Sequence, residues 1–157
     1  MRSVRILCVG KIRERYLAEG LAKLSERIGR YCDFRTVVVK EAKHASRSPA
    51  EWMRFEEKGI LKHLDARHFT VVCDERGVSM TSDALANSFG QWANRGFSRL
   101  DFVVGGAYGL SETVRERANL LLSFSPMTMP HRMFRLFLHE QIYRAFTILK
   151  GEKYHHL

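Results

Sequence analysis

A chain of 157 residues with 45% apolar and 27% charged residues has the composition of a soluble globular protein, and its length fits one domain over 1–157. No apolar run approaches the roughly 20 residues of a membrane-spanning helix, and the N-terminus has no secretory signal, so we expect a cytoplasmic protein that does not insert into membranes. Lysine and arginine number 26 against 17 acidic residues, and the net charge of +9 favours a polyanionic partner, nucleic acid before an anionic membrane surface.

The first elements have clear local signals. Apolar and polar residues alternate over Ser3–Val9, which is typical of a half-buried strand, and leucines then recur at helical spacing up to Ile28. Residues 34–39 form a β-branched strand. The run Ser48-Pro49-Ala50-Glu51 offers an N-cap serine, a proline at the first helical position and a glutamate three residues after the cap. It therefore predicts the start of a helix.

The remaining elements continue the alternation of strands and helices. They are an apolar strand over 69–73, a helix that ends at Gly96, a strand over 100–104, a short helix over 112–119, a short strand over 120–124 and a long helix over 130–149. This order predicts an α/β fold, a three-layer sandwich with a mostly parallel sheet. Ligands collect at the carboxyl ends of parallel strands, which here are 74–77, 105–110 and 125–129.

Cysteine and histidine patterns point away from metal chemistry. Cys8, Cys32 and Cys73 are odd in number and far apart, so we expect free thiols in a reducing compartment rather than disulfides or a metal pair. The histidines lack the His-Glu-x-x-His spacing of a zinc site, and no metal is expected.

Two loops are candidates for ligand binding. Gly105, Gly106 and Gly109 follow a strand and precede a helix, where they permit positive φ and close approach of a ligand to the backbone. No phosphate-loop lysine follows, and a tight structural turn is the alternative. The second loop, over 124–131, is bounded by Pro126 and Pro130, and its two methionines offer apolar surface for an adenine ring. A rigid connector is the alternative there.

The end of the chain is basic and contains an aromatic residue. Tyr154 can stack on a base and His155 can titrate near neutrality. We expect these side chains to form one basic end with four cationic residues, namely Arg135, Arg144, Lys150 and Lys153.

Read together, these segments resemble the SPOUT methyltransferases, and within them the enzymes that modify large-subunit ribosomal RNA. The resemblance covers essentially the whole chain. It rests on Val9-Gly10-Lys11, Gly105-Gly106-x-x-Gly109-Leu110, Leu122-Ser123-Phe124-Ser125-x-Met127-Thr128-x-Pro130-His131, Glu140-Gln141-x-Tyr143-Arg144-Ala145 and Gly151-x-x-Tyr154-His155. It implies a deep trefoil knot in the C-terminal part, S-adenosyl-L-methionine as the cofactor and a homodimer as the active unit.

The resemblance also implies particular site residues. The cofactor contacts carried over by position are Cys73, Gly105, Phe124, Ser125, Pro126, Met127, Thr128 and Met129. The implied substrate is N3 of a pseudouridine in the helix 69 loop of 23S rRNA on the assembled ribosome. Two positions depart from the family pattern: Cys73 is commonly leucine, and Ala107-Tyr108 replaces a small or proline-containing pair.

Methyl transfer requires the imide proton of N3 to leave. We expect His155 to accept it or to order a water that does, Arg144 to stabilise the developing anion and Tyr154 to stack on the extruded base. Three alternatives stay open: a non-enzymatic ribosome-binding protein, a SPOUT methyltransferase of another RNA, and an α/β enzyme that uses a nucleotide phosphate.

Overall fold

The computed structural model describes residues 1–42 and 48–155, in which strands and helices alternate along the chain in the predicted order. The elements are β1 (Ser3–Val9), α1 (Arg15–Ile28), β2 (Asp33–Val39), α2 (Pro49–Leu61), β3 (Phe69–Ser79), α3 (Ser82–Asn94), β4 (Arg99–Val104), α4 (Glu112–Arg115), β5 (Leu120–Ser123) and α5 (His131–Leu149). Relative to the sequence expectation, β3 is longer and α4 is shorter.

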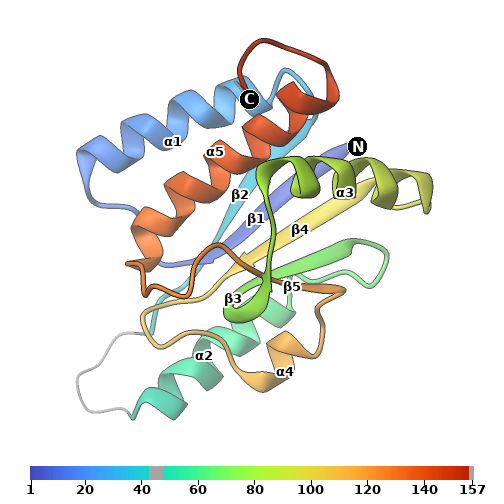
Figure 1. Cartoon of the computed structure of the whole chain (residues 1–157). Coiled ribbons are helices and arrows are strands. Elements are labelled where there is room, and N and C mark those ends of the chain that lie inside the picture. Colours follow the sequence, from blue (N-terminus) through green and yellow to red (C-terminus); the bar gives the residue numbers. More distant parts are fainter. Residues whose placement is uncertain (43–47, 156–157) are drawn as a thin grey trace.

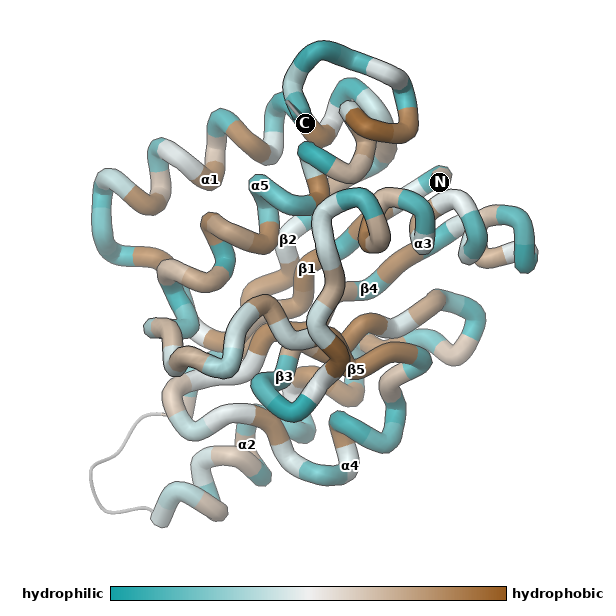
Figure 2. Tube along the Cα trace, in the orientation of Figure 1, coloured by the Kyte–Doolittle hydropathy of each residue, from teal (hydrophilic) through white to brown (hydrophobic). Residues whose placement is uncertain are grey.

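The five described strands form one parallel sheet in the order β2-β1-β4-β3-β5 (Figure 1). Successive side chains alternate between its two faces. Val71 and Phe102 join a core cluster beneath α1, α3 and α5, whereas Val72 and Val103 join a second cluster beneath α2 and α4. Hydrophobic residues accordingly concentrate along the strands (Figure 2). The predicted three-layer α/β sandwich is confirmed.

The end of the sheet next to β5 contains an unusual crossing. Cys73 of β3 pairs with Leu122, and after an outward excursion Val78 pairs with Leu122 again and Ser79 with Ser123. The chain that leaves β5 passes behind the connection from β3 to α3, and α5 then lies between α1 and α3 (Figure 1). This threading agrees with the trefoil knot that the resemblance implied, and the expected fold class is confirmed.

The capping signal at the start of α2 is also confirmed. The Ser48 hydroxyl accepts from the Glu51 backbone N–H at 3.3 Å, and the Glu51 carboxylate accepts from the Ser48 N–H at 2.8 Å. Two backbone donors that the helix itself leaves without partners are thereby bonded. The capping box fixes where α2 begins along the chain.

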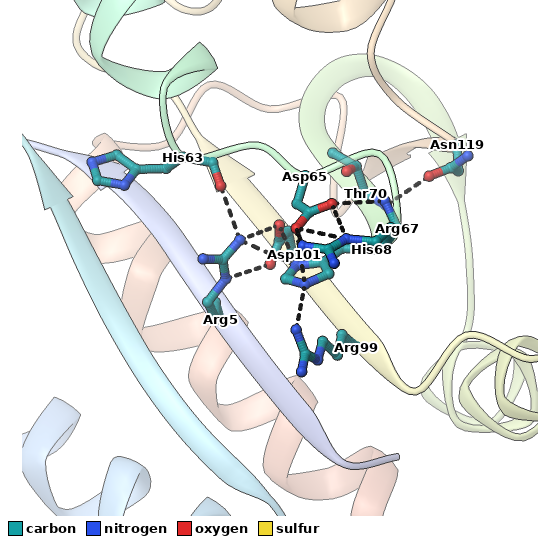
Figure 3. A network of polar contacts seen from close by, with 9 residues as sticks. All are labelled: Arg5, His63, Asp65, Arg67, His68, Thr70, Arg99, Asp101 and Asn119. Carbon is teal, nitrogen blue, oxygen red and sulfur yellow. Dashed lines mark hydrogen bonds and ion pairs between the residues drawn. The ribbon is translucent and has the colours of Figure 1, made fainter.

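A polar network lies at the end of the sheet where β1 and β4 begin (Figure 3). Asp101 is fully buried, and Arg5 donates to its two carboxylate oxygens at 2.8 and 2.6 Å. The imidazole Nδ1 of His68 lies 3.0 Å from the same carboxylate. The pairing compensates the buried charge and joins two strands to the turn that precedes β3.

The three cysteines are free, as expected. Within the described ranges, no helix is long and apolar enough to cross a membrane.

Candidate functional site

A pocket of about 410 Å³ opens at the carboxyl ends of β3, β4 and β5. Residues 73–76 of β3 and the loops that follow β4 and β5 form most of its wall, together with the first turn of α5. Its lining consists of residues 73–76, 104–110, 122–125 and 127–129, with Arg115, His131 and Phe134. All three strand ends singled out in the sequence therefore meet at one place, as the rule for parallel sheets predicts.

Most of the residues expected to contact a cofactor lie in this wall. They are Cys73, Gly105, Phe124, Ser125, Met127, Thr128 and Met129, whereas Pro126 is not among the lining residues. Their role in cofactor binding stays a prediction.

The glycine loop forms a tight turn at the pocket. The Gly109 N–H donates to the Gly106 carbonyl at 3.2 Å, which closes a four-residue turn with Ala107 and Tyr108 at its tip. Gly109 has φ +79°, a conformation that side chains with a Cβ rarely adopt. A Cβ on Gly105 would lie 2.8 Å from the Gly109 carbonyl oxygen. The glycines thus serve the turn, and they also leave its backbone accessible from the pocket.

The loop between β5 and α5 is held by its own serines. The Ser123 hydroxyl donates to the Ser125 carbonyl at 3.2 Å, and the Met127 N–H donates to the Ser125 hydroxyl at 3.0 Å. The Met127 side chain is 76% exposed although it borders the pocket. An exposed methionine at a pocket mouth leaves apolar surface available for a ligand.

An ion pair in the wall was not anticipated from the sequence. Arg115 Nε donates to Asp74 Oδ2 at 2.7 Å. Burial acts to raise the pKa of Asp74, but hydrogen bonds from Arg115 and from the Arg76 backbone outweigh it and lower the pKa below its ordinary value. Asp74 belongs to a strand end that the sequence singled out. Arg115 carries no local signal, because its partner lies 41 positions away in the chain.

Arg135 corrects one sequence expectation. Instead of joining a basic surface at the end of the chain, it is almost completely buried and donates to the carbonyls of Val9 and Gly10. The reason is its position on α5, on the same helical face as the buried Leu138 and Ile142. Arg135 holds the end of β1 against α5.

His131, next to Arg135 in space, lines the pocket at the start of α5. Burial lowers the pKa of this imidazole, and the charges of Arg135 and Arg132 lower it further. Both effects favour the neutral form of His131.

The three residues expected to be catalytic do come together. Arg144 Nε donates to Glu140 at 2.9 Å, its guanidinium lies 4.9 Å from the centre of the Tyr154 ring, and its Nη1 lies 2.9 Å from His155 Nδ1. The Tyr154 hydroxyl donates to Glu140 at 3.3 Å, and His155 Nε2 lies 3.2 Å from Asp83 at the start of α3. We call Arg144, Tyr154 and His155 the tail cluster. Lys150 and Lys153 stay exposed beside it.

The tail cluster and the pocket are separate in one chain. None of the three tail residues lines the pocket. Phe134, which does, precedes Arg144 by ten positions on α5, a rise of about 15 Å along the helix axis. The two halves of the predicted site therefore do not meet within a single subunit.

Comparison with known proteins decides the family. The family model described as "Predicted SPOUT methyltransferase" matches residues 1–155. The chain belongs to the SPOUT methyltransferase family. SPOUT members are methyltransferases, so the protein is a transferase, and the family implies S-adenosylmethionine as methyl donor.

Full-length SPOUT relatives carry a consistent name. A protein from Caldicellulosiruptor saccharolyticus is 37% identical over 97% of this chain and 99% of its own length, and one from Syntrophotalea carbinolica is 42% identical over 96% of each. A third, from Bifidobacterium animalis subsp. lactis, is 42% identical over 98% of this chain and 99% of its own length. All three are named ribosomal RNA large subunit methyltransferase H.

Solved structures share the fold at much lower identity. The tRNA (m1G37) methyltransferase of Aquifex aeolicus matches with a TM-score of 0.54 and 10% identity over 91% of this chain and 70% of its own. A probable methylase family protein of Haemophilus influenzae matches with a TM-score of 0.56 and 11% identity, over 98% of this chain and 70% of its own. At this identity the likeness extends to the SPOUT fold alone.

Proposed function

We propose that this protein transfers a methyl group from S-adenosyl-L-methionine to 23S rRNA, at N3 of a pseudouridine in the helix 69 loop, on the assembled ribosome. The observation that carries the proposal is the match, over nearly the full length of both chains and at 37–42% identity, to proteins named for methylation of large-subunit rRNA. The net charge of +9 agrees with an RNA partner.

The pocket suits the methyl donor in size and chemistry. Its volume of about 410 Å³ lies within the usual range for small-molecule sites. Met127, Met129 and Phe134 supply apolar wall, while the turn around Gly105 presents backbone groups. The cofactor, when bound, supplies a methyl group on a positively charged sulfonium. A protein of charge +9 cannot attract such a cation by its overall field, so close contacts in the pocket must hold it.

We propose that two copies of the chain complete each other's site. Met80, Met133 and Phe137 leave 37%, 37% and 49% of their surface exposed, which suits burial against a second copy. Met133, Phe137 and Arg144 lie along one side of α5, at separations of four and seven residues. Two α5 helices that cross antiparallel at Phe137 would bring Arg144 of the partner subunit close to position 130 of this chain. That position borders the pocket.

The tail cluster contributes the proton chemistry in this proposal. Because a guanidinium can only donate, His155 Nδ1 accepts from Arg144, and its Nε2 carries the proton that faces Asp83. In this arrangement the lone pair of His155 Nδ1 is engaged by Arg144. When Arg144 turns toward the anion that develops on the base, that nitrogen becomes free to accept the N3 proton. Tyr154, stacked against Arg144, is left to pack on the extruded base.

The decisive experiment incubates the purified protein with methyl-labelled S-adenosylmethionine and either intact ribosomes or free 23S rRNA, and then maps the modified nucleotide. We expect label at one pseudouridine of the helix 69 loop, with ribosomes the better substrate. Label on a different RNA would favour another SPOUT specificity. If calorimetry detects no S-adenosylmethionine binding and no label reaches RNA, a non-enzymatic ribosome-binding protein is favoured. Binding of ATP in the same calorimeter would support an enzyme that uses a nucleotide phosphate.

A further inference from the structure

Tyr108 is an exposed aromatic residue at the mouth of the pocket. It lies at the tip of the glycine turn, lines the pocket and leaves 50% of its surface exposed. The residue pair at this tip is also where the sequence departs from the family pattern. A single exposed ring is common on protein surfaces, so what distinguishes Tyr108 is its place on an ordered turn beside a ligand pocket.

Helix α2 holds this turn from behind at two points. The Trp52 ring meets the Tyr108 ring edge to face, with 5.3 Å between centroids and an interplanar angle of 89°. Glu56, one helical turn further on, lies beneath Gly106, where a Cβ would come within 2.6 Å of the Glu56 carboxylate. Trp52 and Glu56 are four residues apart and therefore on one side of α2.

The part of α2 that carries Trp52 and Glu56 is itself held in place. The capping box at Ser48 fixes the first turn of α2 immediately before Trp52. Glu56 is 5% exposed and accepts from the Ala42 N–H at 3.4 Å, which ties the helix to the segment after β2. The Tyr108 ring is thus supported by ordered structure before any ligand arrives. An aromatic ring held in place loses little conformational entropy on binding.

The geometry leaves the Tyr108 ring available for stacking. A perpendicular contact with Trp52 occupies at most one face of the ring. A planar, half-exposed ring beside a pocket is the feature on which unpaired bases stack in proteins that bind single-stranded RNA. The side chain carries no charge with which to bind a phosphate. A nucleobase is the ligand that this surface fits.

We propose that Tyr108, positioned by Trp52 and Glu56, stacks on a base of the RNA substrate next to the methylated nucleotide. The proposal rests on the function proposed above, because it requires an RNA at the pocket. It assigns Tyr108 to substrate positioning and leaves methyl transfer itself to the pocket and the tail cluster.

The test compares Tyr108→Ala and Tyr108→Phe by steady-state methylation of ribosomes, with S-adenosylmethionine affinity measured separately by calorimetry. Removing a base stack costs about 5- to 150-fold in affinity, so Tyr108→Ala should raise the KM for ribosomes by that order. Its kcat at saturating ribosomes and its affinity for S-adenosylmethionine should stay within about twofold of wild type. Tyr108→Phe keeps the ring and should restore the low KM.

A matched control is Tyr16→Ala, which removes another exposed tyrosine, 62% exposed on α1 and outside the pocket lining. It should leave the KM unchanged. An unchanged KM in Tyr108→Ala, an equal rise in Tyr16→Ala, or a Tyr108→Phe variant as defective as Tyr108→Ala would each overturn the stacking role. A Tyr108→Ala variant that mainly loses S-adenosylmethionine affinity would assign the ring to the cofactor instead. If the wild-type protein labels no RNA, the proposed function has failed, and the KM comparison is not reached.

Discussion

The strongest consequence of the site geometry concerns two subunits. Proton transfer needs the accepting nitrogen within about 3 Å of the donor, directly or through one water. The rise of about 15 Å along α5 between Phe134 at the pocket and Arg144 in the tail cluster keeps the two apart within one chain. We therefore expect each active site to combine the pocket of one subunit with the tail of the other.

Two individually inactive variants test this arrangement. His155→Ala removes the proposed base and leaves the pocket intact. Gly105→Ala forces a Cβ to within 2.8 Å of the Gly109 carbonyl oxygen, which must distort the pocket while leaving the tail intact. Each variant alone should lose most activity. If Gly105→Ala does not fold, as judged by its circular dichroism and melting curve, Thr128→Trp replaces it, because Thr128 lines the pocket.

Mixing the two variants after subunit exchange should restore activity. Random pairing makes half of the dimers mixed, and one of the two sites in each mixed dimer has both a sound pocket and a sound tail, so about a quarter of wild-type activity returns. The assay is transfer of labelled methyl groups to ribosomes.

As the control, a chain carrying both substitutions is mixed with wild type. The total activity should fall below that of the same amount of wild-type protein alone, because every mixed dimer then has one defect in each site. No recovery in the first mixture, with half of the wild-type activity in the mixed dimers of the control, would mean that each chain uses its own tail and that our geometric argument is wrong.

Three further predictions concern stability. Ser48→Ala breaks the capping box and should lower the free energy of unfolding by about 1 kcal/mol in urea denaturation; no change would mean that α2 is fixed by packing alone. Asp101→Ala leaves Arg5 and His68 without their shared carboxylate (Figure 3) and should cost about 3–5 kcal/mol in the same assay, whereas a loss below about 1 kcal/mol would contradict the importance of that network. Burial lowers the pKa of His139 from 6.5 to about 4, so below pH 6.5 the unfolded chain binds a proton that the folded chain does not. The free energy of unfolding should thus fall by about 3 kcal/mol because of this group as the pH drops from 7 to 4. In urea denaturation at each pH, His139→Gln should show a smaller fall over this range. An equal fall in the variant would contradict the assignment to His139.

Local sequence was enough where a structural feature depends on neighbours in the chain. The capping box at Ser48 involves residues within a few positions and appears as expected. A strand over Ser3–Val9 is also present, but it is not half-buried as its alternation predicted: burial is continuous from Ile6 to Val9, because β1 lies between β2 and β4 and is covered on both faces. The second half of β3 was missed because Val78 and Ser79 are strand residues only through pairing with β5. No periodicity within that segment could indicate such a pairing.

In the candidate site, too, some features followed from the sequence and others depend on contacts between distant segments. The positions of the pocket loops followed from the order of strands and the rule for parallel sheets, and the resemblance supplied the cofactor and the tail residues. The ion pair of Arg115 with Asp74 joins residues 41 positions apart, and the contact of Trp52 with Tyr108 joins residues 56 positions apart. Arg135 looked like a surface cation because a helical pattern gives the spacing of residues and not the face that the core will cover.

For this protein the sequence alone determined the succession of strands and helices, the basic charge and the loops that had to fall at strand ends. Only the tertiary structure decided the strand order, the passage of the chain behind the β3–α3 connection, and the separation of the tail cluster from the pocket of its own subunit. The reason is physical: local propensities act over a few residues, whereas register, threading and distance between sites are set by contacts between segments far apart in the chain.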